Sequence, residues 1–330
     1  MTKVSVLVAV YNAEKYLRQC LDSLVGQTLK DIQIICIDDA STDNSLNILK
    51  EYALNDSRIV ILQQEKNQGQ AKARNKGLSV VTGDYVTMVD SDDWITLDAL
   101  EKLYEVVVNY PNTDAVLFDL NYYFEDSHNE KPFINKTAKT VLTGKEACLL
   151  SLYWDIHGIY LIRTSIHKTY PYDDSCLLYS DDNTTRFHFL HSREVRFSTG
   201  KYFYRQHDNS FTKADGIRRI DWLEATLSMK DSLTKEDMDR DVLRSYETFR
   251  WIGIVGVYGY YLNHKSIFTK EQQTQILGRI RRSVESVDIS LLDYTKYKFG
   301  YIPFKRCYPL FILQENIYFY LRRLLKRKNV

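Results

Sequence analysis

The sequence predicts an α/β fold, in which a doubly wound and mostly parallel sheet is followed by a helical C-terminal region. Strand-like apolar runs and helix-like amphipathic segments alternate through residue 89, separated by short polar connections. This alternation is typical of a parallel sheet covered by helices. From about residue 215 the pattern becomes helical and aromatic. We therefore expect two domains, residues 1–215 and residues 216–330.

The first strand is expected at Val4–Val10, an unbroken apolar run of the kind found in strands buried on both faces. Parallel strands in such a sheet bind ligands outside their carboxyl ends. Polar clusters follow three of the expected strands, so we expect the functional site at that edge. The remaining strands are expected at residues 32–37, 59–62 and 85–89.

Helices are expected between these strands. The first has Leu17, Leu21 and Leu24 at helical spacing, and Asn12 is expected to cap it. Ser41 or Thr42 is expected to cap the second. The third should run through residues 71–80, and the C-terminal region predicts further helices at residues 220–233, 241–262, 270–287 and 310–328.

Composition argues against several classes of protein. The chain has 44 Lys and Arg against 43 Asp and Glu, and this net charge of +1 argues against a nucleic-acid partner. No apolar run approaches the roughly 18 residues of a membrane-spanning helix, and the N-terminal run is too short for a secretory signal. We therefore expect a cytoplasmic protein. The 5 cysteines, without a C-x-x-C pair, are expected to be reduced core residues.

The glycines do not point to a nucleotide-binding loop. The turn after the first strand, Tyr11-Asn12-Ala13-Glu14, has none, so the dinucleotide fingerprint and the P-loop are both missing there. Gly253, Gly256 and Gly259 recur at helical spacing, and we expect them to form a helix-packing face.

Acidic residues gather at the end of the fourth strand. In extended chain the side chains of Asp90 and Asp92 point the same way. Two carboxylates so placed can hold a hard divalent cation such as Mg²⁺ or Mn²⁺, with positions left for a diphosphate. The alternatives are a solvated acidic turn or a cap of the helix expected at residues 97–103.

Several motifs follow one another in order with characteristic gaps. They are Tyr11-Asn12-Ala13-Glu14 after the first strand, Asp38–Asp43, Asn67–Gly77 and Asp90–Trp94, and together they span residues 1–105. In this respect the sequence resembles the family 2 glycosyltransferases, which are inverting enzymes of the GT-A fold. The resemblance continues more weakly to residue 212, through Ser180-Asp181-Asp182 and Tyr202–His207.

The resemblance implies a nucleotide site. The backbone around Val10 and the ring of Tyr11 would bracket the base, and Asp39 would accept a hydrogen bond from it. Arg74 would place a guanidinium beside the base, and Asp90 would hold the ribose. A uracil N–H suits a carboxylate acceptor, so the expected donor is a UDP-sugar. Two alternatives remain open, namely that Asp39 only caps a helix and that Arg74 is a surface residue.

The resemblance also implies a divalent cation, Mn²⁺ or Mg²⁺, on the donor diphosphate. Asp92 and His207 would ligate it, and Arg205 would contact phosphate. The cation would neutralise the charge that develops on the leaving group. His188 and His191, although three residues apart, are expected to share a helix face and not to bind metal.

For the general base, the resemblance points to Asp182. Its neighbour Asp181 stands where the family more often has Glu, so Asp181 is left open as the base. One of the two could also cap a helix at residues 183–191. Ala40 replaces a glycine common in the family, so its turn either needs no positive φ or tolerates the cost.

The expected activity is transfer of one sugar to a hydroxyl of a bacterial surface polysaccharide or lipid-linked oligosaccharide. Processive members of the family carry membrane spans, which this sequence does not predict. A sugar-nucleotide pyrophosphorylase is one alternative, but it would need a glycine-rich basic loop after the first strand. A non-catalytic carbohydrate-binding protein is another, but it would be expected to lose Asp92 or the acidic pair.

The C-terminal segment is strongly basic. Residues 296–330 hold nine Lys and Arg against one acid, Glu315, with apolar and aromatic residues between them. Such a segment can lie in the interface of an anionic membrane, which would hold the enzyme at the inner face of the cell membrane. The alternative is a helix whose apolar face packs on the catalytic domain and whose cations are merely solvated.

Overall fold

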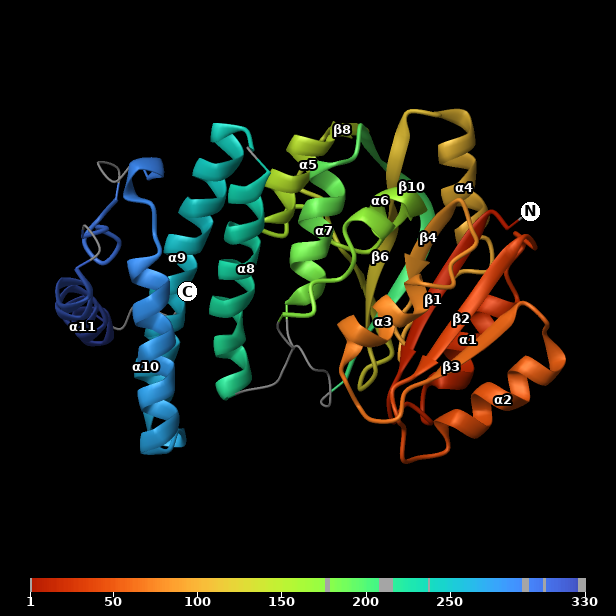
Figure 1. Cartoon of the computed structure of the whole chain (residues 1–330), viewed down its shortest axis with the longest axis horizontal. Coiled ribbons are helices and arrows are strands. Elements are labelled where there is room, and N and C mark those ends of the chain that lie inside the picture. Colours follow the sequence, from red (N-terminus) through yellow and green to blue (C-terminus); the bar gives the residue numbers. More distant parts are fainter. Residues whose placement is uncertain are drawn as a thin grey trace. The chain divides into compact units, whose positions relative to one another are not determined.

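The computed structural model describes residues 2–175, 179–207, 216–236, 238–292, 297–304 and 307–325. The chain divides into two compact units, residues 1–211 and residues 212–330 (Figure 1). The boundary expected near residue 215 lies outside the described residues.

The first unit is built on one mixed sheet that is parallel in its N-terminal half. Its strand order is β3-β2-β1-β4-β9-β6-β10-β5, with β7 paired to β6 and β8 paired to β10. Strands β1, β2, β3 and β4 are parallel, and so are β6 and β10, whereas β9 runs antiparallel between β4 and β6. The strands are β1 Val4–Val10, β2 Ile32–Asp38, β3 Ile59–Gln63, β4 Tyr85–Met88, β5 Trp94–Ile95, β6 Thr113–Phe124, β7 Asn129–Pro132, β8 Val141–Thr143, β9 Tyr160–Arg163 and β10 Glu194–Gln206.

Helices cover both faces of this sheet, which confirms the doubly wound fold. The core on one face joins the sheet to α1, α2 and α4, and the core on the other joins it to α3, α5 and α7. Strand β1 feeds both cores, because Val6 and Val8 lie in the first and Leu7 in the second. The helices are α1 Leu17–Val25, α2 Ser45–Asn55, α3 Gln70–Leu78, α4 Ala99–Asn109, α5 Gly144–Ser151, α6 Thr164–Thr169 and α7 Ser180–Leu190.

Two of the expected helix caps were wrong. Helix α1 begins at Leu17 after Tyr16, and α2 begins at Ser45 after Asn44, with no side-chain cap at either position. Asn12, Ser41 and Thr42 all lie farther from the helix starts than a capping residue does. Their side chains instead join two loops to each other, as described below.

The second unit is helical, as the sequence predicts. Trp251, Tyr258 and Phe311 lie in its core, together with Ile276 and Ile280. No helix of the described residues is long and apolar enough to cross a bilayer. The elements are η2 Ile217–Asp221, α8 Trp222–Lys235, α9 Arg240–His264, η3 Lys265–Ile267, α10 Lys270–Glu285, η4 Ile289–Leu291 and α11 Tyr308–Leu324.

Two of the three glycines of α9 allow other helices to pack closely, but the three do not form one packing face. A Cβ atom at Gly253 would lie 1.9 Å from the ring of Trp222, and one at Gly259 would lie 2.4 Å from the ring of Phe319. These rings belong to α8 and α11, respectively. A Cβ atom at Gly256 would meet nothing within 4 Å among the described parts of the chain. The prediction of a shared face is therefore corrected to two separate ring contacts.

Three of the cysteines, Cys20, Cys36 and Cys148, are free and buried, as expected, whereas Cys307 is free but half-buried. Cys176 lies outside the described residues.

Candidate active site

The carboxyl ends of β1, β2 and β4 bring the polar clusters together. The strands are parallel and in register, with Val10 opposite Asp38 and Leu7 opposite Met88. The sheet ladder continues past the strands, since the Asp39 N–H donates to the Val10 carbonyl at 2.8 Å. Tyr11, Asp39 and Asp90 therefore follow directly from one edge of the sheet, where the sequence predicts the site.

The loops after β1 and β2 are fastened to each other. Asn12 Oδ1 accepts from the Thr42 N–H at 2.8 Å, and the Ala13 N–H donates to Ser45 Oγ at 2.8 Å. Glu14 Oε2 accepts from the Asn44 N–H at 2.9 Å. These bonds span about thirty residues, which is why local capping rules misassigned Asn12, Ser41 and Thr42. The fastening leaves the Tyr11 ring 43% exposed at the edge.

Ala40 and Asn12 adopt strained backbone conformations in these loops. Their φ angles are 60° and 49°, in the left-handed region. Asn tolerates that region better than Ala does. Of the two possibilities for Ala40, the structure selects a turn with positive φ whose cost is tolerated.

Asp39 is 3% exposed and organises the loop before α3. Its Oδ1 accepts from Gln64 Nε2 and from the Gln68 N–H, both at 2.8 Å, and its Oδ2 accepts from the Gly69 N–H at 2.8 Å. Gly69 is the residue before α3, so the capping alternative describes part of what Asp39 does. A carboxylate has about four acceptor positions, and these bonds use three of them.

Arg74 is 1% exposed, so the surface alternative for this residue was wrong. Its Nη2 donates to Asp90 Oδ1 at 2.5 Å. Its guanidinium also lies over the ring of Tyr172, 5.4 Å from the centroid. Arg74 therefore fixes Asp90 and balances its charge. Sequence reasoning missed Tyr172, which carries no signal in the motifs.

A cluster of acids surrounds this pair. Burial raises the pKa of Asp90, Arg74 lowers it, and the negative charges of Asp92 and Asp181 raise it again. Asp181, in the first turn of α7, and Met88, at the end of β4, line the same small cavity. Asp181 therefore lies near the acidic turn that holds Asp90 and Asp92.

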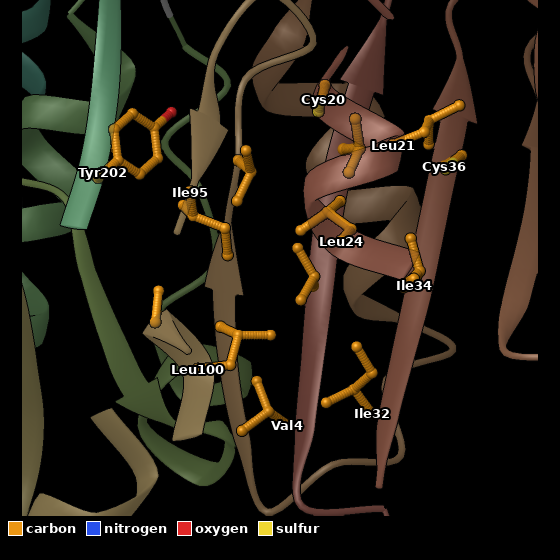
Figure 2. Close-up of a cluster of buried hydrophobic side chains, with 14 of the residues drawn as sticks. Val4, Cys20, Leu21, Leu24, Ile32, Ile34, Cys36, Ile95, Leu100 and Tyr202 are labelled. Carbon is orange, nitrogen blue, oxygen red and sulfur yellow. The ribbon is translucent and has the colours of Figure 1, made fainter. Parts of the chain in front are cut away.

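Asp93, for which the sequence predicts no role, joins the acidic turn to strand β10. It is 1% exposed, and it accepts from Tyr202 Oη at 2.7 Å and from the Arg205 N–H at 2.8 Å. Tyr202 Oη in turn accepts from the Asp90 N–H at 3.1 Å. Burial raises the pKa of Asp93 well above its usual range. The Tyr202 ring lies in the buried hydrophobic cluster of Figure 2, so the acidic turn is anchored to the core.

Arg205 lies among aromatic rings. Its guanidinium is 4.6 Å from the ring centroids of both Tyr16 and Trp94. Nε donates to the Asp92 carbonyl at 2.7 Å, and Nη2 donates to Gln19 Oε1 at 2.5 Å. The side chain is 5% exposed. Arg205 thus positions the backbone of Asp92, a task that the sequence did not predict, while its contact with phosphate stays a prediction.

Asp92 and His207 meet across the site. Asp92 Oδ2 and His207 Nε2 are 2.9 Å apart, with side-chain exposures of 32% and 11%. The imidazole also lies against Tyr16, with 5.1 Å between ring centroids. Carboxylate and imidazole are ligands that suit Mn²⁺, and Mg²⁺ commonly takes only one or two carboxylates with substrate phosphates. The pair therefore fits a divalent cation brought in with a diphosphate, although among the described residues no three His, Cys, Asp or Glu side chains are arranged to hold a metal ion by themselves.

Asp181 and Asp182 lie in the first turn of α7. This helix begins at Ser180, three residues before the start expected at residue 183. Neither carboxylate occupies the capping position, which is Tyr179. Asp181 Oδ1 accepts from the Asp182 N–H at 3.0 Å. Burial raises the pKa of Asp182 to about 6, the nearby Arg186 lowers it, and the charge of Asp181 raises it. A carboxylate with such a pKa is a competent base near neutral pH.

A small cavity of about 10 Å³, enough for one water molecule, lies beside Asp181 and is also lined by Tyr172 and His167. Both ring nitrogens of His167 are buried and lack a hydrogen-bond partner within the described ranges. Burial lowers the pKa of His167 well below its usual range, so the ring is neutral. Sequence reasoning missed this histidine.

His188 lies in α7, His191 is the residue that follows it, and both rings have partners within the protein. His188 Nε2 lies 2.8 Å from the Tyr170 carbonyl, and its Nδ1 lies 2.7 Å from Tyr160 Oη. His191 stacks on the Tyr170 ring at 4.0 Å. Burial lowers the pKa of His188 to about 4.

Comparisons with known proteins place this site in context. A family model described as "Glycosyl transferase family 2" matches residues 5–170. The chain is 46% identical to the glycosyltransferase GlyA of Streptococcus pneumoniae over 143 residues, which cover 40% of this chain and 20% of GlyA. It is 28% identical to GlyG, a glycosyltransferase of the same species, over 297 residues that cover 84% of this chain and 95% of GlyG.

The fold is similar to that of S. aureus TarS 1–349, solved in complex with UDP-GlcNAc. The TM-score is 0.75 at 20% sequence identity, and the match covers 96% of this chain and 91% of that one. This likeness confirms the predicted fold over nearly the whole chain.

Proposed function

This chain belongs to glycosyltransferase family 2, and on that premise we propose that it is an inverting enzyme that transfers one sugar from a UDP-sugar to an acceptor hydroxyl. The proposed acceptor is a bacterial surface polysaccharide or a lipid-linked oligosaccharide. The observation that carries the proposal is that the first turn of α7, which holds Asp181 and Asp182, lines one cavity with the end of β4, which leads to Asp90. Burial there raises the pKa of Asp182 to about 6.

The donor side of the site supports a uridine nucleotide. Tyr11 offers an exposed ring on which a base can stack. Asp39 has one acceptor position left for the N–H of uracil, because three are used by Gln64, Gln68 and Gly69. Asp90, which accepts a hydrogen bond from Arg74, would also accept from the ribose hydroxyls.

A divalent cation, Mn²⁺ or Mg²⁺, is part of the proposal. Asp92 and His207 would hold it, and when bound it supplies positive charge to the diphosphate that leaves. Arg205 keeps the Asp92 backbone in place through its bond to the Asp92 carbonyl. The chain's own contribution here is one carboxylate and one imidazole, whose nearest atoms lie 2.9 Å apart.

The transfer step conserves all atoms. The acceptor hydroxyl oxygen forms a bond to the anomeric carbon as the bond from that carbon to the diphosphate oxygen breaks. Asp182 takes the hydroxyl proton, and UDP leaves with the bonding electron pair. Attack from the face opposite the leaving group inverts the anomeric centre. The positive charge of Arg186, 3.7 Å from Asp182, lowers the pKa of that carboxyl and so limits the increase caused by burial.

The test is a donor panel with matched variants. Purified protein is assayed for release of UDP from UDP-sugars, with Mn²⁺ or with EDTA, and the Asp182→Asn variant is compared with Asp241→Asn. Asp241 also lies in the first turn of a helix, in the second unit. We expect Asp182→Asn to lose about a hundredfold or more in turnover while it still binds UDP, and Asp241→Asn to keep full turnover.

Three results would contradict parts of this proposal. Binding of a UDP-sugar without any turnover would favour the carbohydrate-binding alternative. Full turnover in EDTA would remove the cation and the ligand roles of Asp92 and His207. A larger loss in Asp181→Asn than in Asp182→Asn would make Asp181 the base.

A further inference from the structure

Helix α11 is anchored to its own unit by one face. Phe311 is 1% exposed, and its ring centroid lies 5.7 Å from that of Trp251 and 5.4 Å from that of Tyr258. Phe319 fills the space left by Gly259 of α9. Tyr258 Oη donates to Asn316 Oδ1 at 3.0 Å. The apolar residues on this inner face are therefore accounted for by packing within the second unit.

The same helix carries a second apolar face that points outward. Its residues form what we call the outer stripe, and their exposures range from 42% for Ile317 to 62% for Tyr320 and Leu324. At about 100° per residue, they all fall within an arc of roughly 100°. Contiguous exposed apolar surface of this kind marks an interaction site. The outer stripe consists of Leu310, Leu313, Ile317, Tyr320, Leu321 and Leu324.

Charge distinguishes the partner. Arg323 lies in the last turn of α11, about 60° around the helix from the outer stripe, whereas Arg322 falls on the side of the buried Phe311. Lys326, Arg327 and Lys328 follow in the sequence. Arg323 Nη2 donates to the Leu262 carbonyl at 3.2 Å and to Asn263 Oδ1 at 3.0 Å. These bonds engage neutral acceptors, so the positive charge of Arg323 is not cancelled.

The single acid of the segment does not offset these cations. Glu315 lies on the inner face of α11 and is fully buried. Burial raises its pKa to about 8, against a smaller lowering by Gln314. The carboxyl is therefore mostly protonated at neutral pH, and it adds little negative charge beside Arg323.

We propose that the outer stripe of α11 docks onto an anionic lipid surface, with the stripe in the interface and Arg323, beside it, against a phosphate headgroup. An exposed apolar stripe with a cation beside it and further cations next in the sequence matches the chemistry of helices that lie in the plane of such an interface. This docking is separate from the transfer reaction. If the acceptor is lipid-linked, as proposed above, docking would keep the enzyme on the surface that holds it.

Vesicle co-sedimentation of the full chain tests the proposal. The vesicles contain phosphatidylcholine alone or phosphatidylcholine with phosphatidylglycerol. We expect binding to the anionic vesicles that weakens as salt is added, and little binding to the neutral ones. The double variant Leu313→Glu/Leu324→Glu should partition about tenfold less well, because it places charge in the apolar stripe.

A matched control carries the same added charge elsewhere. Leu54 and Ile267 are exposed apolar residues outside α11, at 87% and 57% exposure, and Leu313 is also 57% exposed. The Leu54→Glu/Ile267→Glu variant should partition like the wild type, apart from a small general loss from its two negative charges. Circular dichroism and melting of both variants check that the fold is intact.

Other occupants of the stripe predict other results. If the stripe joins two copies of the chain, analytical ultracentrifugation will show that Leu313→Glu/Leu324→Glu dissociates an oligomer, with no vesicle binding in the wild type. If the stripe packs on the first unit, Leu313→Glu/Leu324→Glu will melt at a lower temperature than the wild type, and the wild type will not bind vesicles. Either outcome overturns the proposal, as does equal vesicle binding by the stripe variant and its control.

Failure of this inference is separable from failure of the proposed function. Vesicle binding is measured without any nucleotide sugar. Conversely, release of UDP from a donor in solution is measured without vesicles, and Leu313→Glu/Leu324→Glu should leave that rate unchanged.

Discussion

Asp182 lies beside another carboxylate in the first turn of α7, and its surroundings decide its chemistry. Burial and the charge of Asp181 raise its pKa to about 6, while Arg186 opposes them. For a general base this is a useful value, because the group is ionised at neutral pH and still binds a proton well. The pKa depends on Asp181, which gives the neighbouring residue a measurable role even if it never touches the transferred proton.

The pH dependence of kcat/KM follows from this assignment. Because the base must be ionised, kcat/KM should be half-maximal near pH 6 and fall about tenfold per pH unit below it. Asp181→Asn removes a negative charge that raises the pKa of Asp182, so its midpoint should move to lower pH. Rates measured from pH 4.5 to 8, roughly, in both proteins test this. A midpoint that Asp181→Asn leaves in place would contradict the proposed coupling.

Asp182→Asn should also raise stability. A carboxyl whose folded-state pKa lies above its usual 3.8 is harder to ionise when folded, so it costs stability as pH rises through about 4 to 6, and the cost is full above that. Asparagine removes this cost at neutral pH, which is worth about 1–3 kcal/mol. Thermal melting at pH 7 should show the gain, and at pH 4 it should be largely absent. A loss of stability at pH 7 would mean that the carboxylate is better solvated than the structure indicates.

At the scale of elements, the helices of the second unit are held at short distance by rings that fill glycine positions. Trp222 of α8 sits over Gly253, and Phe319 of α11 sits over Gly259. The third glycine of the series, Gly256, has open space within 4 Å of its virtual Cβ among the described residues. These three positions therefore offer an internal comparison within a single helix.

Gly253→Ala should destabilise the protein, because its new methyl group would overlap the Trp222 ring. Overpacking of this kind costs about 1–3 kcal/mol. Gly256→Ala is the matched control, and it should be neutral or stabilising by up to about 1 kcal/mol, since Ala is the better helix former. Urea unfolding followed by circular dichroism measures both. Equal effects at the two positions would contradict the packing described for α8 against α9.

On the scale of the whole molecule, the candidate site lies in the sheet unit and the exposed apolar stripe in the helical unit. The residues that hold the nucleotide and the cation in our proposal all belong to residues 1–211, whereas α11 belongs to residues 212–330. A ligand that binds only the folded first unit stabilises that unit by mass action. The two units should therefore respond differently to donor nucleotide.

UDP with Mn²⁺ should raise the melting temperature of the first unit. At about a hundred times its Kd, a ligand adds roughly 2.7 kcal/mol, which for a unit of this size corresponds to several degrees. Differential scanning calorimetry with UDP and Mn²⁺, and with UDP and EDTA, tests the joint site. We expect UDP to raise the melting temperature less in EDTA than in Mn²⁺. In Asp92→Asn, the increase should be the same in Mn²⁺ and in EDTA. Identical rises in Mn²⁺ and in EDTA would contradict cation binding by Asp92 and His207.

The sequence by itself determined the doubly wound sheet, the helical region after it and the edge at which the site lies. Hydrophobic periodicity is a local property, and it suffices to place Val4–Val10 as a strand and residues 241–262 as a helix. Once the strands are known to be parallel, their carboxyl ends share an edge, so Asp39, Asp90 and Asp92 had to lie near one another. These predictions needed no knowledge of distant contacts.

Only the tertiary structure decided how those residues are held. The Asp93–Tyr202 bond joins residues 109 positions apart, and Arg205 reaches Gln19 across 186 positions. The caps expected at Asn12, Ser41 and Thr42 were wrong for the same reason, because bonds between two distant loops outweighed local capping. Burial also depends on contacts made by the whole chain. The sequence could therefore choose Asp182 by resemblance, but its raised pKa, like the inward orientation of Glu315, follows from packing that no local pattern encodes.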